Sequence, residues 1–156
     1  MADTRIRIAK DKAELVKALK DGSDLNGPFQ TYADVVAFAA MLGVNRGRRI
    51  PLSEVCKSDP DPIPQDHFIS RRYEKIMQLL AVSATQNPKV LADKECCEEE
   101  RVRIFEEYAN AGLEILQNSL SGSIDYLEQI LLLLKVERNN SATFSSEFDL
   151  TRFLSA

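Results

Sequence analysis

The stretch PFQTYADVVAFAAMLGVNRGRRIPL, residues 28–52, joins a capped apolar helix to a cluster of arginines. Thr31 is a good N-cap, and Asp34 stands where the acidic partner of a capping box belongs. The apolar positions that follow form a broad face, and Gly43 supplies the residue type that commonly ends a helix. We predict a helix over residues 31–42, buried on most sides because Asp34 is its only charged residue. Its apolar face suits a core position or a contact between two copies of the chain in a homodimer.

Arginines gather at two places in the first third of the chain. One group follows the predicted helix directly and puts positive charge at the exit of a buried element, which suits an anionic or protein partner. The other alternates with apolar residues in TRIRI, residues 4–8, a pattern that predicts one short strand. The candidate partner-binding or DNA-binding residues are therefore Arg5, Arg7, Arg46, Arg48 and Arg49.

Helical periodicity dominates the rest of the chain. It predicts helices over residues 11–20, 65–85, 99–120 and 123–137, whereas four prolines between residues 51 and 64 predict an extended link. The run Ile130-Leu-Leu-Leu-Leu134 is apolar all round, which places it at the centre of a bundle. The predicted fold class is mostly α, with a small N-terminal strand-plus-helices portion, then a helical bundle, then a flexible C-terminal tail.

The chain length fits a single domain. We predict one compact unit over residues 1–138, divided into an N-terminal subdomain (1–50), a proline-rich link (51–64) and a helical bundle (65–138). Residues 139–156 form a tail or docking strap. Its apolar anchors suit either docking on the chain's own bundle or gripping a partner as a short linear motif. These anchors are Phe144, Phe148, Leu150, Phe153 and Leu154.

Composition predicts a soluble cytoplasmic protein. The longest strongly apolar run is far shorter than the ~20 residues that span a bilayer, and the N-terminus has no apolar signal core. Cys96 and Cys97 are neighbours and Cys56 stands apart, a pattern that fits reduced thiols in a cytosol. We expect no membrane partner.

The net charge of −4 hides an asymmetry between the two parts of the chain. Residues 1–60 carry 10 Lys/Arg against 8 Asp/Glu, and residues 61–156 carry 10 against 16. A strand followed by two helices is also the order found in ribbon-helix-helix DNA readers. The long connector between the predicted helices and the acidic net charge of the chain weigh against direct DNA binding. The same arginines could pair as readily with carboxylates of another subunit.

No catalytic or metal-binding signature is present. His67 is the single histidine, and it has no second histidine or well-spaced cysteine with which to build a usual zinc site. The chain lacks nucleotide-binding glycine motifs, a nucleophile elbow and the metalloprotease motif. We predict that the protein is not an enzyme and uses no cofactor and no metal.

Several segments resemble the Dnd (DNA phosphorothioation) system-associated protein 4 family. They are RIRIAKDKAELVKAL at the start, FQTYADVVAFAAMLG with GRRIPL, RVRIFEEYANAGLEIL, and the closing EFDLTRFL, and together they cover most of the chain. The resemblance implies a bacterial cytoplasmic protein that accompanies antiviral defence on the restriction side of restriction-modification, and it brings no catalytic residues. We therefore predict a non-enzymatic accessory subunit that binds other phosphorothioation-system proteins. The alternative is a DNA-binding regulator or recruiter that uses the basic N-terminal residues.

Overall fold

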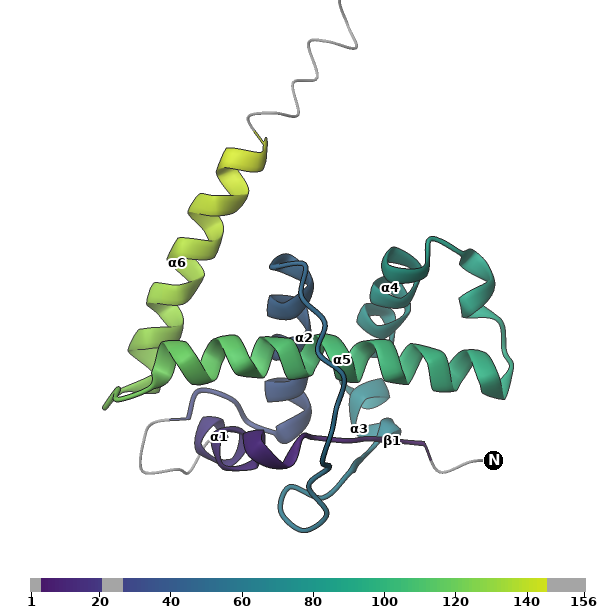
Figure 1. The fold of residues 1–156 in the computed structure, drawn as a ribbon, viewed down its shortest axis with the longest axis horizontal. Helices are drawn as coiled ribbons and strands as arrows, with labels where there is room; N and C mark the ends of the chain where they lie inside the picture. Colours follow the sequence, from purple (N-terminus) through teal and green to yellow (C-terminus); the bar gives the residue numbers. More distant parts are fainter. Residues whose placement is uncertain (1–3, 21–26, 146–156) are drawn as a thin grey trace, which may run out of the picture.

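The computed structural model describes residues 4–20 and 27–145, with residues 141–145 as helical backbone only. It confirms a mostly helical fold with one small two-stranded sheet near the N-terminus. The longest helix runs the length of the molecule, and the other elements are arranged along it (Figure 1). In chain order the elements are β1 (Arg5–Ile6), η1 (Lys10–Lys12), α1 (Ala13–Leu19), α2 (Tyr32–Asn45), β2 (Ile63–Pro64), α3 (Gln65–Ser70), α4 (Glu74–Thr85), η2 (Pro88–Leu91), α5 (Glu95–Leu120) and α6 (Tyr126–Ser145).

The predicted capping box at the start of α2 is confirmed. The Asp34 amide donates to Thr31 Oγ1 over 3.2 Å, and the Thr31 amide donates to Asp34 Oδ2 over 3.1 Å. Gly43, however, does not end this helix, because α2 continues to Asn45. The left-handed residue after the helix is Gly47, with φ of +63°.

We expect the substitution Thr31→Ala to lower the free energy of unfolding by about 1 kcal/mol, because it leaves the Asp34 amide without its side-chain acceptor. Urea denaturation of both proteins measures the difference. Thr31→Ser keeps the hydroxyl and should retain most of the stability. An equal loss in the serine variant would show that the methyl group matters and the cap does not.

Two glycines bring α2 and α5 into close contact. A β carbon added at Gly112 of α5 would lie 1.7 Å from the Ala39 carbonyl oxygen, and one at Gly43 of α2 would lie 2.1 Å from the Tyr108 carbonyl oxygen. Each helix therefore presents a glycine to the backbone of the other. Gly43 serves helix packing, which explains why it lies inside α2 rather than at its end.

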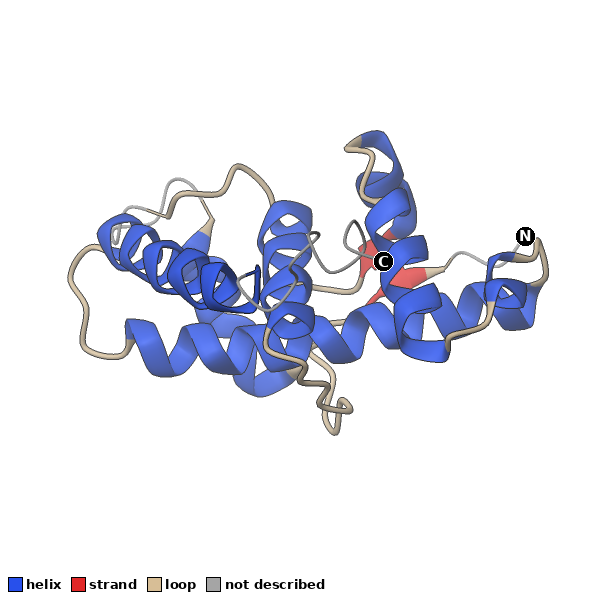
Figure 2. Cartoon of the chain, turned by 90° about the horizontal axis from the view of Figure 1, so that it is seen from above, coloured by secondary structure: helices blue, strands red, loops and turns tan. Residues whose placement is uncertain are grey.

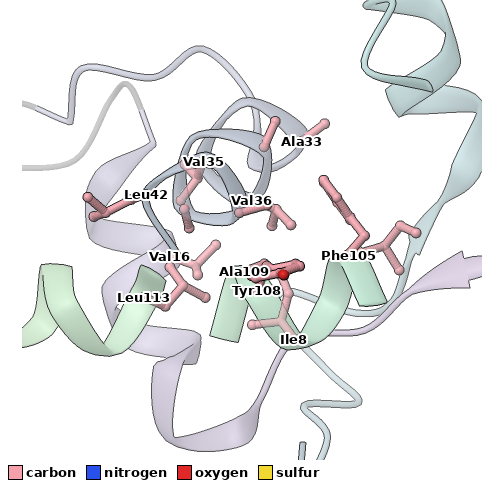
Figure 3. Close-up of a cluster of buried hydrophobic side chains, with 14 of the residues drawn as sticks. Ile8, Val16, Ala33, Val35, Val36, Leu42, Phe105, Tyr108, Ala109 and Leu113 are labelled. Atoms are coloured by element: carbon pink, nitrogen blue, oxygen red, sulfur yellow. The ribbon is translucent and has the colours of Figure 1, made fainter. Parts of the chain in front are cut away.

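The core forms around this crossing. Figure 3 shows apolar side chains of α2 meeting those of α5, with Ile8 and Val16 closing one side. Phe68 of α3 meets Phe105 of α5 edge-on, with ring centroids 5.6 Å apart. The predicted apolar face of α2 is thus largely buried within the chain, so the core position explains it without a homodimer.

The predicted N-terminal strand forms, and it pairs with the end of the proline-rich link. β1 and β2 are antiparallel, with Ile6 opposite Ile63 (Figure 2, red). The Cys56 amide also donates to the Ile8 carbonyl oxygen over 2.8 Å. The link therefore folds back along the first residues of the chain.

The helix predicted over residues 65–85 is in fact two helices, α3 and α4. The helix is interrupted around Arg72, which adopts a left-handed φ of +65°. The side chains on both sides of the break bind Asp34 of α2: Arg71 Nη1 lies 3.0 Å from Oδ1, and the Tyr73 hydroxyl donates to Oδ1 over 2.6 Å. Tertiary contacts, which helical periodicity does not predict, therefore hold both sides of the break against α2.

The last two helices also differ from their predicted bounds. α5 begins at Glu95, four residues before the predicted start at residue 99, and α6 begins at Tyr126 rather than at residue 123. α6 also extends to Ser145, so residues 139–145 of the predicted tail are helical.

Candidate protein-binding surface

Helix α6 lies at the edge of the molecule (Figure 1), and only one side of it is buried. Ile130 and Leu133 are buried, at 4% and 9% exposure, whereas Leu131 and Leu134 are 52% and 44% exposed. The prediction that the whole run 130–134 lies at the centre of a bundle is therefore wrong. Five large apolar side chains of α6 remain exposed: Leu127, Leu131, Leu132, Leu134 and Val136. Leu127, Leu131 and Leu134 follow one another at i, i+4 and i+7 and so share one side of the helix, which we call the leucine face.

A buried carboxylate ties α6 to the C-terminal end of α2. Glu137 is 8% exposed, and it accepts hydrogen bonds from the Asn45 side-chain amide and, over 2.7 Å, from Arg46 Nε. Because Glu137 follows Ile130 and Leu133 at helical spacing, these three residues define the inward side of α6. The leucine face therefore stays turned away from the core.

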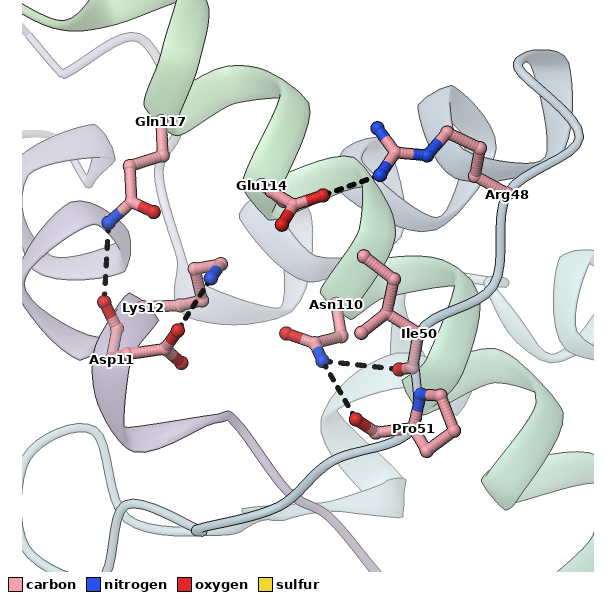
Figure 4. Close-up of polar contacts among 8 residues, drawn as sticks. All are labelled: Asp11, Lys12, Arg48, Ile50, Pro51, Asn110, Glu114 and Gln117. Carbon is pink, nitrogen blue, oxygen red and sulfur yellow. Dashed lines mark hydrogen bonds and ion pairs between the residues drawn. The ribbon is translucent and has the colours of Figure 1, made fainter.

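The other two arginines after α2, Arg48 and Arg49, pair with acidic residues of α5. Arg48 Nη2 lies 2.6 Å from Glu114 Oε2, and Arg49 Nη2 lies 2.6 Å from Glu107 Oε2. Between these two acids, the Asn110 side-chain amide donates to the Ile50 and Pro51 carbonyl oxygens over 3.1 and 3.4 Å (Figure 4). The segment after α2 is thus fastened along α5.

The strand arginines also make contacts within the chain. Arg7 Nε lies 2.9 Å from Glu106 Oε2, and Arg5 Nη1 donates to the Pro62 carbonyl oxygen over 3.3 Å. Glu106 is 2% exposed. Burial raises its pKa above the ordinary value of 4.5, and the neighbouring Arg7 guanidinium opposes that rise.

The structure therefore brings Arg7 and Arg49 to consecutive residues of α5, Glu106 and Glu107. The binding role assigned to the five arginines stays a prediction. Of the tail anchors, Phe144 falls in the helical backbone of α6, and Phe148, Leu150, Phe153 and Leu154 lie outside the described residues.

The acidic partners of the arginines were not predicted from the sequence, because each lies at least 58 residues away in the chain. Glu106 and Glu137 are buried, and Glu107 and Glu114 line the path of the arginine segment. One signal was available: Glu107 and Glu114 are seven residues apart, which puts them on one side of a helix.

The residues considered for chemistry are dispersed. His67 is exposed on α3, Cys56 is buried, and Cys97 lies beside Cys96 with 4.0 Å between sulfur atoms. Desolvation raises the pKa of the Cys97 thiol, and Cys96 adds to this rise. Across residues 4–20 and 27–145, no group of three or more His, Cys, Asp or Glu side chains is placed to hold a metal ion. None of the helices described there is long and apolar enough to cross a bilayer.

The fold and its surface define a small, mostly helical protein with an exposed apolar helix at one edge. The family model for DNA sulphur modification system-associated protein 4 matches residues 5–153. The chain belongs to this family, as its segments suggested. Neither the curated proteins nor the solved structures contain a significant match.

Proposed function

We propose that the chain is a non-enzymatic accessory subunit of a DNA sulphur modification system, and that it binds another protein of that system through the leucine face. The observation that carries this proposal is the exposure of Leu131 and Leu134 in the middle of a helix anchored by Glu137. Scattered exposed leucines need no explanation, but a contiguous apolar face on one helix typically marks an interaction site. The bacterial cytoplasm and a role in antiviral defence belong to this proposal.

The surroundings of the leucine face indicate the chemistry of its partner. Glu128, Lys135 and Arg138 are exposed on the same helix and put charges of both signs beside the leucines. Burying a large aliphatic side chain contributes about 1.5–3 kcal/mol, so half-exposed leucines together contribute several kcal/mol. Association itself costs about 4–15 kcal/mol, so a polar rim must add to the apolar contact. The partner surface that fits the leucine face is therefore an apolar groove bordered by both acidic and basic side chains.

Support for the alternative, a DNA-binding regulator or recruiter, is weaker. Such a protein would bind DNA phosphates with its arginines, and contacts of this kind account for much of the affinity of DNA-binding proteins. Here Arg7, Arg46, Arg48 and Arg49 each pair with a glutamate of the chain. DNA would have to compete with these carboxylates, whereas a protein partner of α6 would leave all four pairs intact.

The double substitution Leu131→Glu/Leu134→Glu should abolish recovery of the protein partner, because it puts two charges in the middle of the apolar contact. The measurement is an affinity pull-down from cells that carry the complete sulphur modification system, with the bound system proteins quantified by mass spectrometry. Both positions are exposed, so the variant should keep the wild-type thermal unfolding midpoint.

Asn118→Glu is the matched control, since it introduces the same residue at an exposed polar position of α5, outside the leucine face and its charged rim. It should retain the partner. Full recovery of the same system proteins by the folded leucine double variant would contradict the proposed role of α6.

A further inference from the structure

A second apolar surface lies between α2 and the start of α4, two elements that stand on the same side of α5 (Figure 1). It is a groove of about 480 Å³, a size within the ~300–1,000 Å³ of typical ligand pockets. Met41 closes the end nearest the C-terminus of α2 and is 41% exposed. The lining residues are Pro28, Phe29, Gln30, Asp34, Ala37, Phe38, Met41, Tyr73 and Ile76.

The one charged residue of the groove is already satisfied. The two oxygens of Asp34 accept four hydrogen bonds, from the Thr31 amide and hydroxyl, from Arg71 and from the Tyr73 hydroxyl. Asp34 therefore offers little to an incoming polar group. What remains accessible is apolar: Phe29 and Phe38, whose ring centroids lie 5.2 Å apart, with Met41 and Ile76. The groove suits aromatic and aliphatic side chains.

We propose that the C-terminal segment of the same chain occupies this groove, with Phe153 and Leu154 as the inserted side chains. Residues 146–156 carry four large apolar side chains among eleven residues. The other segments outside the described part, residues 1–3 and 21–26, carry one each, Met1 and Leu25. The C-terminal segment is thus the richest source of apolar anchors that the described fold leaves unassigned.

The length of the segment permits this docking. Glu137 binds the end of α2 at Asn45, and Met41 lies one helical turn, about 6 Å, before Asn45. α6 carries the chain about 12 Å beyond Glu137 to Ser145. From Ser145 to Phe153 an extended chain spans about 26–29 Å. The extended segment can therefore run back about 12 Å to the level of Glu137, and about 14 Å of its length remains to reach Met41.

Docking within one chain is also favoured by its short connection. Closing a loop of this size costs little chain entropy compared with the burial of two large apolar side chains. The inference is independent of the proposed function, because the groove involves α2 and α4 whereas the leucine face belongs to α6. The family match ends at residue 153 and so includes most of the segment.

The test is photo-crosslinking in the full chain with the benzophenone amino acid p-benzoylphenylalanine at position 153. Illumination of the purified protein should give crosslinks within single chains to residues of the groove, chiefly Met41, and their yield should not depend on protein concentration. Peptide mapping by mass spectrometry identifies the attachment points.

Met41→Glu should abolish crosslinking to the groove, and Met41→Leu, which keeps the site apolar, should retain it at Phe38 or Ile76. Leu91→Glu is the matched control, since Leu91 is 43% exposed and lies outside the groove. It should leave the yield unchanged. Crosslinks only between chains, crosslinks elsewhere on the fold, no crosslinks, or an unchanged yield in Met41→Glu would each overturn the proposal.

Discussion

Gly112→Ala is expected to lower the free energy of unfolding by about 3 kcal/mol, although a single methyl group is added. The new β carbon would lie 1.7 Å from the carbonyl oxygen of Ala39 and 2.5 Å from its carbonyl carbon. These are backbone atoms of a buried helix, so the clash can be relieved only by moving α2 away from α5. That movement would loosen the apolar core around the crossing.

This expectation opposes the intrinsic preference of the two residues. In an open helix, alanine in place of glycine stabilises by about 1 kcal/mol. Asn118→Ala provides the control, because Asn118 is exposed on α5 and the change should be neutral or slightly stabilising. Chemical denaturation of the three proteins measures the effect. A Gly112→Ala protein as stable as the wild type would show that α2 and α5 are not in this close contact.

Arg7→Ala is expected to cost about 3 kcal/mol at neutral pH. It leaves the Glu106 carboxylate buried without its partner, and breaking a buried ion pair on one side costs about 3–5 kcal/mol. We expect the lower end of this energy range because the Arg7 side chain is half exposed and solvent screens its interaction with Glu106. Denaturation measurements on Arg7→Ala and on Arg7→Lys test this. Arg7→Lys keeps the charge and should lose less stability than Arg7→Ala. A loss below about 0.5 kcal/mol in Arg7→Ala would contradict the buried pair.

The same pair should make stability depend on pH. Burial raises the pKa of Glu106 in the folded protein above 4.5, so the folded state binds the proton more tightly than the unfolded state. The contribution of Glu106 is therefore most favourable at low pH and is lost as the pH rises from 4.5 through the raised folded pKa. Relative to Glu106→Gln, the wild type should lose stability over this window.

Unfolding measured from about pH 4 to about pH 8 provides the comparison. The decline should be larger in Arg7→Ala, because removing the guanidinium lets burial raise the Glu106 pKa further. Glu99→Gln, at an exposed position of α5, should show no comparable difference from the wild type. A pH-independent difference between the wild type and Glu106→Gln would contradict the raised pKa.

Local signals in the sequence were sufficient where the structure is governed by neighbouring residues. The Thr31 and Asp34 capping box depends on four consecutive residues and formed as predicted. Gly43 looked like a helix end by the same local rules, but its role depends on Tyr108 of α5. The break at Arg72 is likewise flanked by contacts to Asp34, more than thirty residues earlier. Both features involve contacts between distant segments, and periodicity within one helix does not report such contacts.

The candidate surface could be predicted only in part. The run 130–134 was recognised as strongly apolar, but composition alone does not distinguish a core helix from an exposed one. The five arginines were recognised as two charged groups, yet the pairing of Arg7, Arg48 and Arg49 depends on how α5 passes beside them. Glu106 gave no sequence signal of burial, because a charged residue is normally expected at the surface.

The most direct test of the proposed protein-binding role is to recover the tagged full chain from cells with the complete sulphur modification system, with and without nuclease. We predict that a protein of that system is retained in fixed proportion to the chain, and that its recovery is unchanged by nuclease and little affected by moderate salt. Recovery of DNA alone, or loss of every system protein after nuclease treatment, would contradict it and favour the DNA-binding alternative.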